Sequence, residues 1–475
     1  MSLPAHGASV LGECRVAGLA NSVECGTIGR PLDPARPSGP QIGIHFMVVP
    51  AMARRKLADP VFLLAGGPGQ SAITLAPSVL PLLRRLNNRR DLVFVDQRGT
   101  GKSAPLECED TRREPLSDQS DPERQTALLA RCRAQLEKLP ALGGPSGLRF
   151  FTTTIAMQDL DAVRRELGYA RINLVGTSYG TRAALEYQRQ FPAAVRRAVL
   201  DGVAPPDMAL PASFSTDAQA AFDAVLAACE NEAACAKAHP ALRTDWAVLL
   251  KSLPKAVVVP DALTGEPTPL LLTRDVLLGT VRGPLYLPAL AAALPAAIDA
   301  AGRGRYEALA GIAALLSARK GSQLAMGMHF SVVCAEDLPR LAAARDQPGA
   351  DFGADFVRLY ERVCADWPRG DVPAAFYAVP RSASPVLLLS GGLDPATPPR
   401  HGARVALALG PLAQHVVVPH AGHGVMGLGC MREVIFRFID AADDSAATAV
   451  DASCALRIPR PPAFQPIASS AQAER

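Results

Sequence analysis

A serine flanked by glycines stands where an apolar run gives way to a helical pattern. The pentapeptide GTSYG (176–180) follows the apolar run 172–175, and residues 181–190 continue with helical periodicity. In this strand–turn–helix context, the pattern G-x-S-x-G is typical of a nucleophile elbow, a sharp turn that exposes the serine Oγ. A serine hydroxyl is a weak nucleophile at neutral pH, so it needs a base and an acid that orients the base. Ser178 is therefore predicted to be the nucleophile of an acyl transfer.

His423 is the predicted general base. It lies in HAGHG (420–424), directly after the apolar run 415–418, and it is the last histidine of the chain. When the serine sits on an elbow, the order along the chain is serine, acid, histidine. His420 is the competing residue, and the glycines on both sides of His423 favour the latter. An H-x-x-H pair can also bind a metal, but no third ligand lies near this one, so no metal is expected.

Asp394 is the predicted acid of this set. It lies in the loop GGLDP (391–395), after an apolar run, where a carboxylate can reach the imidazole Nδ1. Asp201, at the end of the preceding apolar run, is the alternative acid. We expect Asp201 to fix the turn at Gly202 instead, so Asp394 is the preferred partner of His423.

Acyl transfer also needs backbone N–H groups that bind the developing oxyanion. Tyr179, the residue after the nucleophile, is predicted to supply one donor. The turn GGPG (66–69) can supply the other from Gly67, because a glycine lets the backbone approach a substrate without a Cβ clash. Gly67 and Tyr179 are therefore the predicted oxyanion hole.

The segment GTGKS (99–103) resembles the end of a phosphate-binding Walker A loop. The full motif requires a glycine where Asp96 stands, so the match fails. We expect residues 96–99 to brace the loop beneath the active site. The sequence contains no metal-ligand constellation, so no cofactor is expected.

The elements that must position these residues are short apolar strands. They are rich in β-branched residues, and most are followed by a segment with helical periodicity. This pattern is typical of a mainly parallel sheet covered by helices on both faces. Between Pro205 and Ser384 the sequence becomes rich in Ala and Leu, with helical periodicity and few strands. We predict an α/β core in two parts, 1–204 and 385–475, and a helical lid insertion at 205–384. The predicted strands lie within 42–50, 61–69, 91–103, 172–180, 196–203, 385–399 and 414–424, and a further helix is predicted at 153–167.

Six ordered motifs resemble the α/β-hydrolase aminopeptidases of the proline iminopeptidase and tripeptidyl aminopeptidase group. They are AGGPG, DQRGTGKS, GTSYG, LDGV, SGGLDPATPP and AGHG. The resemblance covers about 42–204 and 385–430, and the segment 385–456 is similar to the C-terminal region of the tripeptidyl aminopeptidases. It implies an α/β-hydrolase fold, a triad of Ser178, Asp394 and His423, peptide substrates with a free N-terminus, and export.

In exopeptidases of this group, an acidic group in the insertion meets the substrate's amino terminus. The segment VCAED (333–337) resembles the family's C-x-D/E element, which makes Glu336 the candidate substrate-binding residue and Asp337 the second choice. The alternative is that these two acids form a solvated helix end.

Ten cysteines point to an oxidising compartment. Taken in order they form five local pairs, 14–25, 108–132, 229–235, 334–364 and 430–454. Ten buried free thiols and a set of disulfides both remain open, and disulfides would indicate a secreted or periplasmic protein. Residues 1–6 have neither the basic nor the apolar region of a signal peptide, so we expect Met1 to stand where a removed signal peptide ended.

Composition excludes other classes of protein. The 475 residues carry 49 Lys and Arg against 45 Asp and Glu, and no basic run exceeds three residues, so no nucleic acid partner is expected. The longest uncharged apolar run, 283–298, contains three prolines and is shorter than the roughly 20 residues of a membrane span. No membrane span is therefore expected, and the sequence carries no signal for an oligomeric state.

Three functions fit these residues. The first is a serine aminopeptidase that releases residues or short peptides, prolyl or tripeptidyl, from peptide N-termini. The second is an esterase or amidase acting on small apolar substrates. The third is a non-catalytic binding protein with a hydrolase fold, which a complete set of nucleophile, acid and base argues against.

Overall fold

A nine-stranded sheet forms the centre of the computed structural model, which describes residues 11–464 apart from 112–113, 115–117, 119–120, 261–263 and 318–322. Its strand order is β1-β2-β3-β5-β4-β6-β7-β10-β11. Neighbours from β5 to β11 pair in parallel, and β1 to β3 extend the sheet in antiparallel pairing. The strands are β1 (Leu11–Cys14), β2 (Val23–Pro31), β3 (Gln41–Val49), β4 (Val61–Leu64), β5 (Leu92–Val95), β6 (Ile172–Thr177), β7 (Val195–Asp201), β10 (Val386–Gly391) and β11 (Ala413–Val418).

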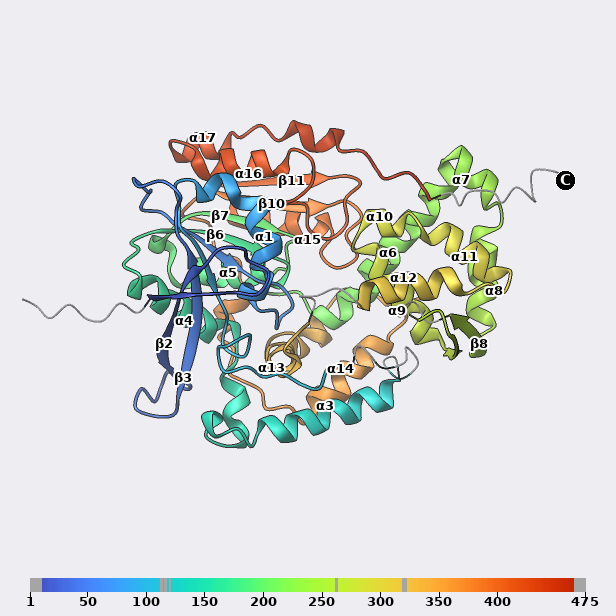
Figure 1. Cartoon of the computed structure of the whole chain (residues 1–475), viewed down its shortest axis with the longest axis horizontal. Coiled ribbons are helices and arrows are strands. Elements are labelled where there is room, and N and C mark those ends of the chain that lie inside the picture. Colours follow the sequence, from blue (N-terminus) through green and yellow to red (C-terminus); the bar gives the residue numbers. More distant parts are fainter. Residues whose placement is uncertain are drawn as a thin grey trace, which may run out of the picture.

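Helices cover both faces of this sheet, as the continuous apolar strands predict. On one face, α4 (Thr153–Glu166), α5 (Tyr179–Gln190) and α15 (Pro399–Leu409) pack on inward side chains of the strands. On the other face lie α1 (Ala72–Asn87) and α16 (Met431–Asp440). Every residue of the short strands β4 and β5 is buried, because neither face of the central sheet meets water. The predicted α/β-hydrolase sheet is thus confirmed (Figure 1).

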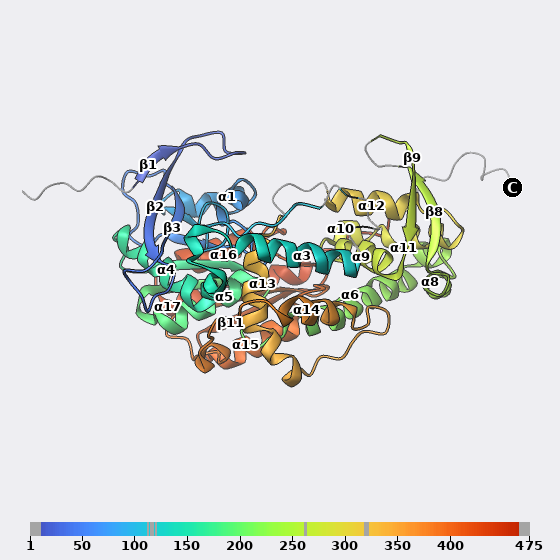
Figure 2. The same cartoon turned by 90° about the horizontal axis from the view of Figure 1, so that it is seen from below.

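Part of the chain between β7 and β10 forms a second hydrophobic cluster, built mainly from α6, α8, α9 and α11, whereas α13 and α14 pack into the cluster on the sheet. It also contains a two-stranded hairpin, β8–β9, which Figure 2 shows at the end of the molecule opposite β1 to β3. The elements are α6 (Leu210–Asn231), α7 (Ala233–Ala238), α8 (Leu242–Lys251), β8 (Lys255–Pro260), β9 (Pro267–Leu272), α9 (Arg274–Leu285), α10 (Pro288–Ala291), α11 (Leu294–Gly302), α12 (Glu307–Ser317), α13 (Met326–Glu336) and α14 (Asp355–Ala365). The boundaries of the predicted insertion, 205 and 384, and its action as a lid remain predictions.

The remaining helices connect these parts. They are α3 (Pro122–Leu136), α17 (Asp444–Thr448) and short 3-10 helices at Pro140–Leu142, Pro145–Phe150, Pro192–Ala194, Leu338–Ala343, Ala374–Tyr377 and Ser453–Arg457. Residues 458–464 are coil, and the N–H of Phe464 donates a hydrogen bond to the carbonyl of Ala292. Within the described ranges, no helix has both the length and the apolar character needed to cross a membrane.

All ten cysteines are paired in disulfides, and the pairs follow the order of the sequence. They are Cys14–Cys25, Cys108–Cys132, Cys229–Cys235, Cys334–Cys364 and Cys430–Cys454. The prediction of five local disulfides is therefore confirmed, and the alternative of ten free thiols is wrong. Each bridge stabilises by restricting the unfolded chain.

Alkylation of the denatured protein, made in an oxidising compartment, is expected to modify no cysteine before reduction and ten after it. Replacing Cys430 and Cys454 together by Ser opens a loop with a sequence separation of 24 residues. We expect this double variant to lose about 3 kcal/mol of unfolding free energy, which a shift of the denaturant midpoint would report. Ten modified cysteines without reductant would contradict the pairing.

Candidate active site

Ser178 occupies a strained turn between β6 and α5. Its backbone has φ 57° and ψ −126°, a positive φ that costs a non-glycine residue on the order of 1–3 kcal/mol. The turn is held because the Ser178 N–H donates to the carbonyl of Asp201 at 2.9 Å. A Cβ at Gly180 would lie 2.1 Å from the carbonyl oxygen of Leu64, and one at Gly176 would lie 2.4 Å from that of Gly180. Only glycines allow this close packing, so the sequence has the residues that an elbow requires.

His423 and Asp394 lie together at the ends of β11 and β10. The Nδ1 of His423 is 2.8 Å from Oδ2 of Asp394. The Asp394 side chain is 1% exposed, and its Oδ1 accepts hydrogen bonds from the backbone N–H groups of Ala396 and Thr397, at 2.8 Å each. The Thr397 hydroxyl donates to Oδ2 at 2.9 Å and lies 3.1 Å from Nδ1 of His423. The carboxylate is thereby fixed before any substrate arrives.

The two side chains shift each other's pKa. Burial by itself lowers the pKa of His423, but the charge and hydrogen bond of Asp394 outweigh it, and the pKa of His423 is raised. Burial by itself raises the pKa of Asp394, but the contact with His423 and the backbone donors lower it below its usual range. The pair therefore keeps an ionised carboxylate beside a basic imidazole.

Asp201 and His420, the alternative acid and base, do not contact the ring of His423 or the carboxylate of Asp394 through a hydrogen bond in the described ranges. Both carboxylate oxygens of Asp201 accept from the Val425 N–H at 2.9 Å, and one also accepts from the Met426 N–H. Asp201 thus fastens the loop that carries His423 rather than bonding its ring. His420 is exposed. Of the competing pairs, the structure brings together Asp394 and His423.

Two residues of the site have no counterpart in the sequence predictions. Thr397 follows Asp394 by three residues, and an Asp side chain commonly bonds backbone groups this close in sequence, so a local signal exists. Tyr286 follows α9, and its carbonyl accepts from the His423 N–H at 3.0 Å while its ring meets the imidazole edge-to-face, with centroids 5.1 Å apart. Its position depends on tertiary packing and leaves no local signal.

The predicted oxyanion donors flank Ser178. Tyr179 is the first residue of α5, so its N–H has no acceptor one turn earlier in the helix. Gly67 has φ 111°, and a Cβ there would lie 2.6 Å from the Gly69 nitrogen. The neighbouring Gly66 approaches so closely that its own Cβ would lie 3.1 Å from Cβ of Ser178. The GGPG turn therefore lies against the nucleophile, and its role as a donor remains a prediction.

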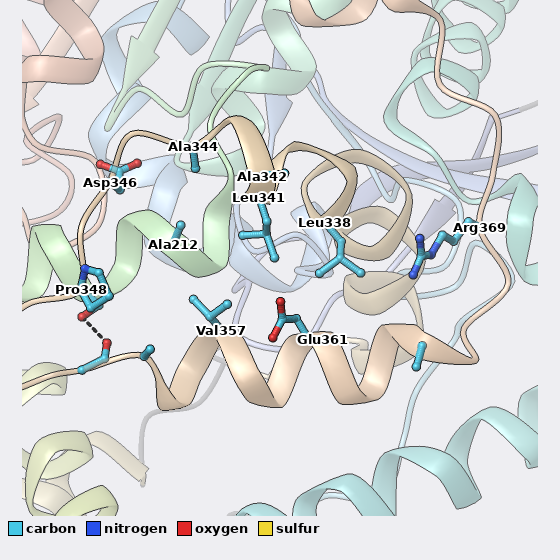
Figure 3. Close-up of a pocket in the computed structure, with 14 residues that line it drawn as sticks. Ala212, Leu338, Leu341, Ala342, Ala344, Asp346, Pro348, Val357, Glu361 and Arg369 are labelled. Carbon is cyan, nitrogen blue, oxygen red and sulfur yellow. Dashed lines mark hydrogen bonds between the residues drawn. The ribbon is translucent and has the colours of Figure 1, made fainter.

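A cavity of about 400 Å³ opens beside His423. Its wall includes Gly66, Gln70, Thr177 and Asp201, with apolar side chains from α1 and the strands. A larger cavity of about 710 Å³ lies between α6, α14 and the segment after α13. Figure 3 shows Val357 and Glu361 rising from α14 towards Leu338 and Leu341 in that second cavity. None of the triad candidates lines it.

Glu336 and Asp337 are buried, so the expectation of a solvated helix end is wrong. Glu336 is 1% exposed and accepts from the N–H of Thr153 at 2.7 Å and from its hydroxyl at 2.9 Å. That hydroxyl is also 2.7 Å from the Tyr179 hydroxyl. Asp337 forms a bidentate pair with Arg182 at 2.9 and 3.0 Å. Burial raises the pKa of Glu336 to about 7 against the opposing charge of Arg182.

The loop that resembles a Walker A end braces the fold. The Asp96 carboxylate accepts from the Ser71 hydroxyl at 2.7 Å and from the Ile73 N–H at 3.2 Å. Arg98 is fully buried and pairs with Asp159, with contacts at 2.7 and 3.0 Å. Over the described part of the chain, no three His, Cys, Asp or Glu side chains are grouped as metal ligands.

Comparison with known proteins agrees with this architecture. The family model for the alpha/beta hydrolase fold matches residues 59–255, and the family model for the TAP-like proteins matches residues 350–454. The serine protease Hip1 of Mycobacterium tuberculosis is 28% identical over 462 residues, 87% of this chain and 84% of that protein. Carboxylesterase B of M. tuberculosis is 29% identical over 421 residues, 82% of this chain and 78% of its own. The tripeptidyl aminopeptidase of Streptomyces coelicolor is 32% identical over 196 residues, 40% of this chain and 36% of that protein.

The sheet order, the elbow and the two matched regions point to the same group. The two matches cover separate parts of the chain, and the stretch between them, 256–349, lies within the helical segment that follows β7. The chain has the α/β-hydrolase fold, and its C-terminal region is similar to the TAP-like proteins.

Proposed function

We propose that this protein is a serine hydrolase that forms an acyl-enzyme on Ser178. The observation that carries the proposal is the buried Asp394–His423 hydrogen bond at the same sheet edge as the elbow serine. A non-catalytic role would not require a strained serine beside this pair. The cavity next to His423 gives a substrate access to the imidazole.

The proposed reaction follows from the positions of these groups. The Ser178 Oγ attacks the substrate carbonyl while Nε2 of His423 takes its proton, because Nδ1 is bonded to Asp394. The N–H groups of Gly67 and Tyr179 bind the oxyanion. The imidazolium then protonates the leaving amine, and a water molecule, activated by His423, releases the acyl group from Ser178.

The proposed substrates are peptides with a free amino terminus, from which the enzyme removes residues or short peptides. Relatives named as a serine protease and a tripeptidyl aminopeptidase support this class. An esterase or amidase is the second candidate, and a relative named carboxylesterase B, aligned over 82% of this chain, favours it. Five disulfides support a secreted or periplasmic location, since such bonds persist in oxidising compartments.

We also propose that residues 205–384 act as a lid on the core. The carbonyl of Tyr286, which follows α9, bonds the backbone of His423, so this segment reaches the candidate site. Glu336 is the proposed anchor for the amino terminus. Because its carboxylate is bonded to Thr153, an ammonium group would have to replace those hydrogen bonds.

Ser178→Ala is expected to keep the fold and to lower turnover by about 10⁴-fold or more, since the nucleophile is lost. The measurement uses aminoacyl, prolyl and tripeptidyl p-nitroanilides beside short-chain p-nitrophenyl esters. A serine-directed organophosphate should label Ser178 of the parent only. Ser445→Ala, at an exposed position, is the control. Full activity of the Ser178 variant would overturn the assignment.

Asp394→Asn is expected to lower kcat by about 10³- to 10⁴-fold and to move the acid limb of the pH–rate profile to lower pH. Catalysis needs neutral His423, so activity falls as pH drops through its pKa. Asp394 raises that pKa, and without its charge the opposing effect of burial remains. Asp201→Asn should move the limb less, because Asp201 bonds no ring atom. An unmoved limb in Asp394→Asn would contradict the pairing.

Glu336→Gln tests the anchor. We expect a 10- to 10³-fold lower kcat/KM on substrates with a free amine, roughly the effect of losing a charged hydrogen bond, with a small neutral ester nearly unaffected. The same peptides acetylated at the amino terminus give the matched substrate control. An equal loss on amines and ester would assign Glu336 to support of α5 through Thr153.

A further inference from the structure

An aromatic cavity of about 300 Å³ lies between α3, α6, α9 and α14. Its walls include the rings of Phe214, Phe352 and Phe356, with Leu278 and Leu359. This cavity is separate from the one lined by Gly66 and Asp201 beside His423. Apolar walls with a few polar groups are typical of a pocket that binds a small molecule or a side chain.

Arg282 is the cation of this cavity. Its guanidinium carbon lies 4.4 Å from the ring centre of Phe214 and 5.6 Å from that of Phe356. One amino group donates to the Tyr286 hydroxyl at 3.0 Å, but the buried Nε has no acceptor. In the described ranges no carboxylate approaches the guanidinium of this half-buried arginine within 4.0 Å, whereas the buried Arg98 and Arg182 each have one. A partly desolvated cation without a counter-ion is costly, so the cavity favours an anionic ligand.

The other end of the cavity carries carboxyl groups instead of a cation. Asp275 also lines the cavity and precedes Arg282 by seven residues on α9, which places it roughly 10 Å away along the helix axis. Burial and the nearby Asp355 raise the pKa of Asp275. Asp355 also lines the cavity and pairs with Arg358. In the described ranges neither carboxylate lies within 4.0 Å of the Arg282 guanidinium, so an anion is favoured only at the Arg282 end.

Arg282 is close to the candidate active site. The Tyr286 ring lies 5.5 Å from the guanidinium carbon and 5.1 Å from the imidazole centre of His423, so one ring separates the two groups. An extended peptide advances about 3.3–3.6 Å per residue. A substrate whose carbonyl is at Ser178 could therefore reach Arg282 with a group two or three residues away.

We propose that Arg282 binds a carboxylate of the substrate, which makes it a specificity-determining residue. This rests on the proposed peptidase function. The carboxylate can come from an acidic side chain on the acyl side or from the free carboxyl terminus of a short peptide. The rings of Phe214, Phe356 and Tyr286 lie against the guanidinium and hold it at the cavity wall.

The first arm of the test compares tripeptidyl p-nitroanilides that differ only by Glu or Gln at each acyl-side position. The second arm compares short peptides with a free carboxyl terminus and with a terminal amide. We expect the parent to prefer the carboxylate by 10- to 100-fold in kcat/KM in one of the two arms, which identifies the source. Arg282→Gln should abolish the preference and leave the neutral substrate within about threefold. Arg274→Gln, on the same helix but exposed, should keep it.

A parent that shows no preference in either arm overturns the inference, whether or not Arg282→Gln folds. So does an equal loss on the charged and neutral substrates, not restored by Arg282→Lys, because Arg282 would then only position Tyr286. If no peptide or anilide is cleaved, the proposed function fails instead. In that case p-nitrophenyl hydrogen glutarate and its methyl ester provide the same comparison, and equal rates on the two esters overturn the inference.

Discussion

The buried carboxylate of Asp394 is the constraint on which the candidate site depends. A charge removed from water has to be met by donors, and here two backbone N–H groups, the Thr397 hydroxyl and the His423 ring meet it. These contacts fix the loop after β10 and, through His423, the loop after β11. Asp201 fixes the second loop independently by accepting from Val425 and Met426. The imidazole is thus oriented from two sides before a substrate binds.

A second buried ionic network connects the elbow helix with the segment after β7. Arg182, on α5, pairs with Asp337, which also accepts from the backbone N–H of Leu210 at the start of α6. Glu336 bonds Thr153, whose hydroxyl meets the side chain of Tyr179. The ends of α6 and α13 are therefore fastened to the helix that follows Ser178. A movement of this segment that strained the network would be transmitted to the elbow.

Local patterns were sufficient for β3 to β7, β10 and β11, for the elbow and for the pairing of Asp394 with His423, because each depends on residues close in sequence or on the known order of a triad. The strands β1 and β2 were not predicted. The environment of Glu336 was not predictable, since acidic residues at a helix end look solvated until the partners Thr153 and Arg182 are placed. The hairpin β8–β9 was not predicted. Val257 and Val259 of β8 are buried and the residues between and beside them are exposed, but the run KAVVVP does not show this alternation in its residue types. Arg282 and Tyr286 gave none, because Tyr286 contacts a loop more than a hundred residues later and Arg282 contacts rings on α6 and α14.

The charges around His423 also connect the cavity with the base. Asp394 raises the pKa of His423, whereas the positive charge of Arg282 lowers it. A substrate carboxylate bound at Arg282 would neutralise that positive charge and leave the effect of Asp394 less opposed. The imidazole would then become more basic only when a substrate of the proposed kind occupies the aromatic cavity. Because Asp394 affects the pKa of His423 more than Arg282 does, the main role of Arg282 in this arrangement would be to select the substrate.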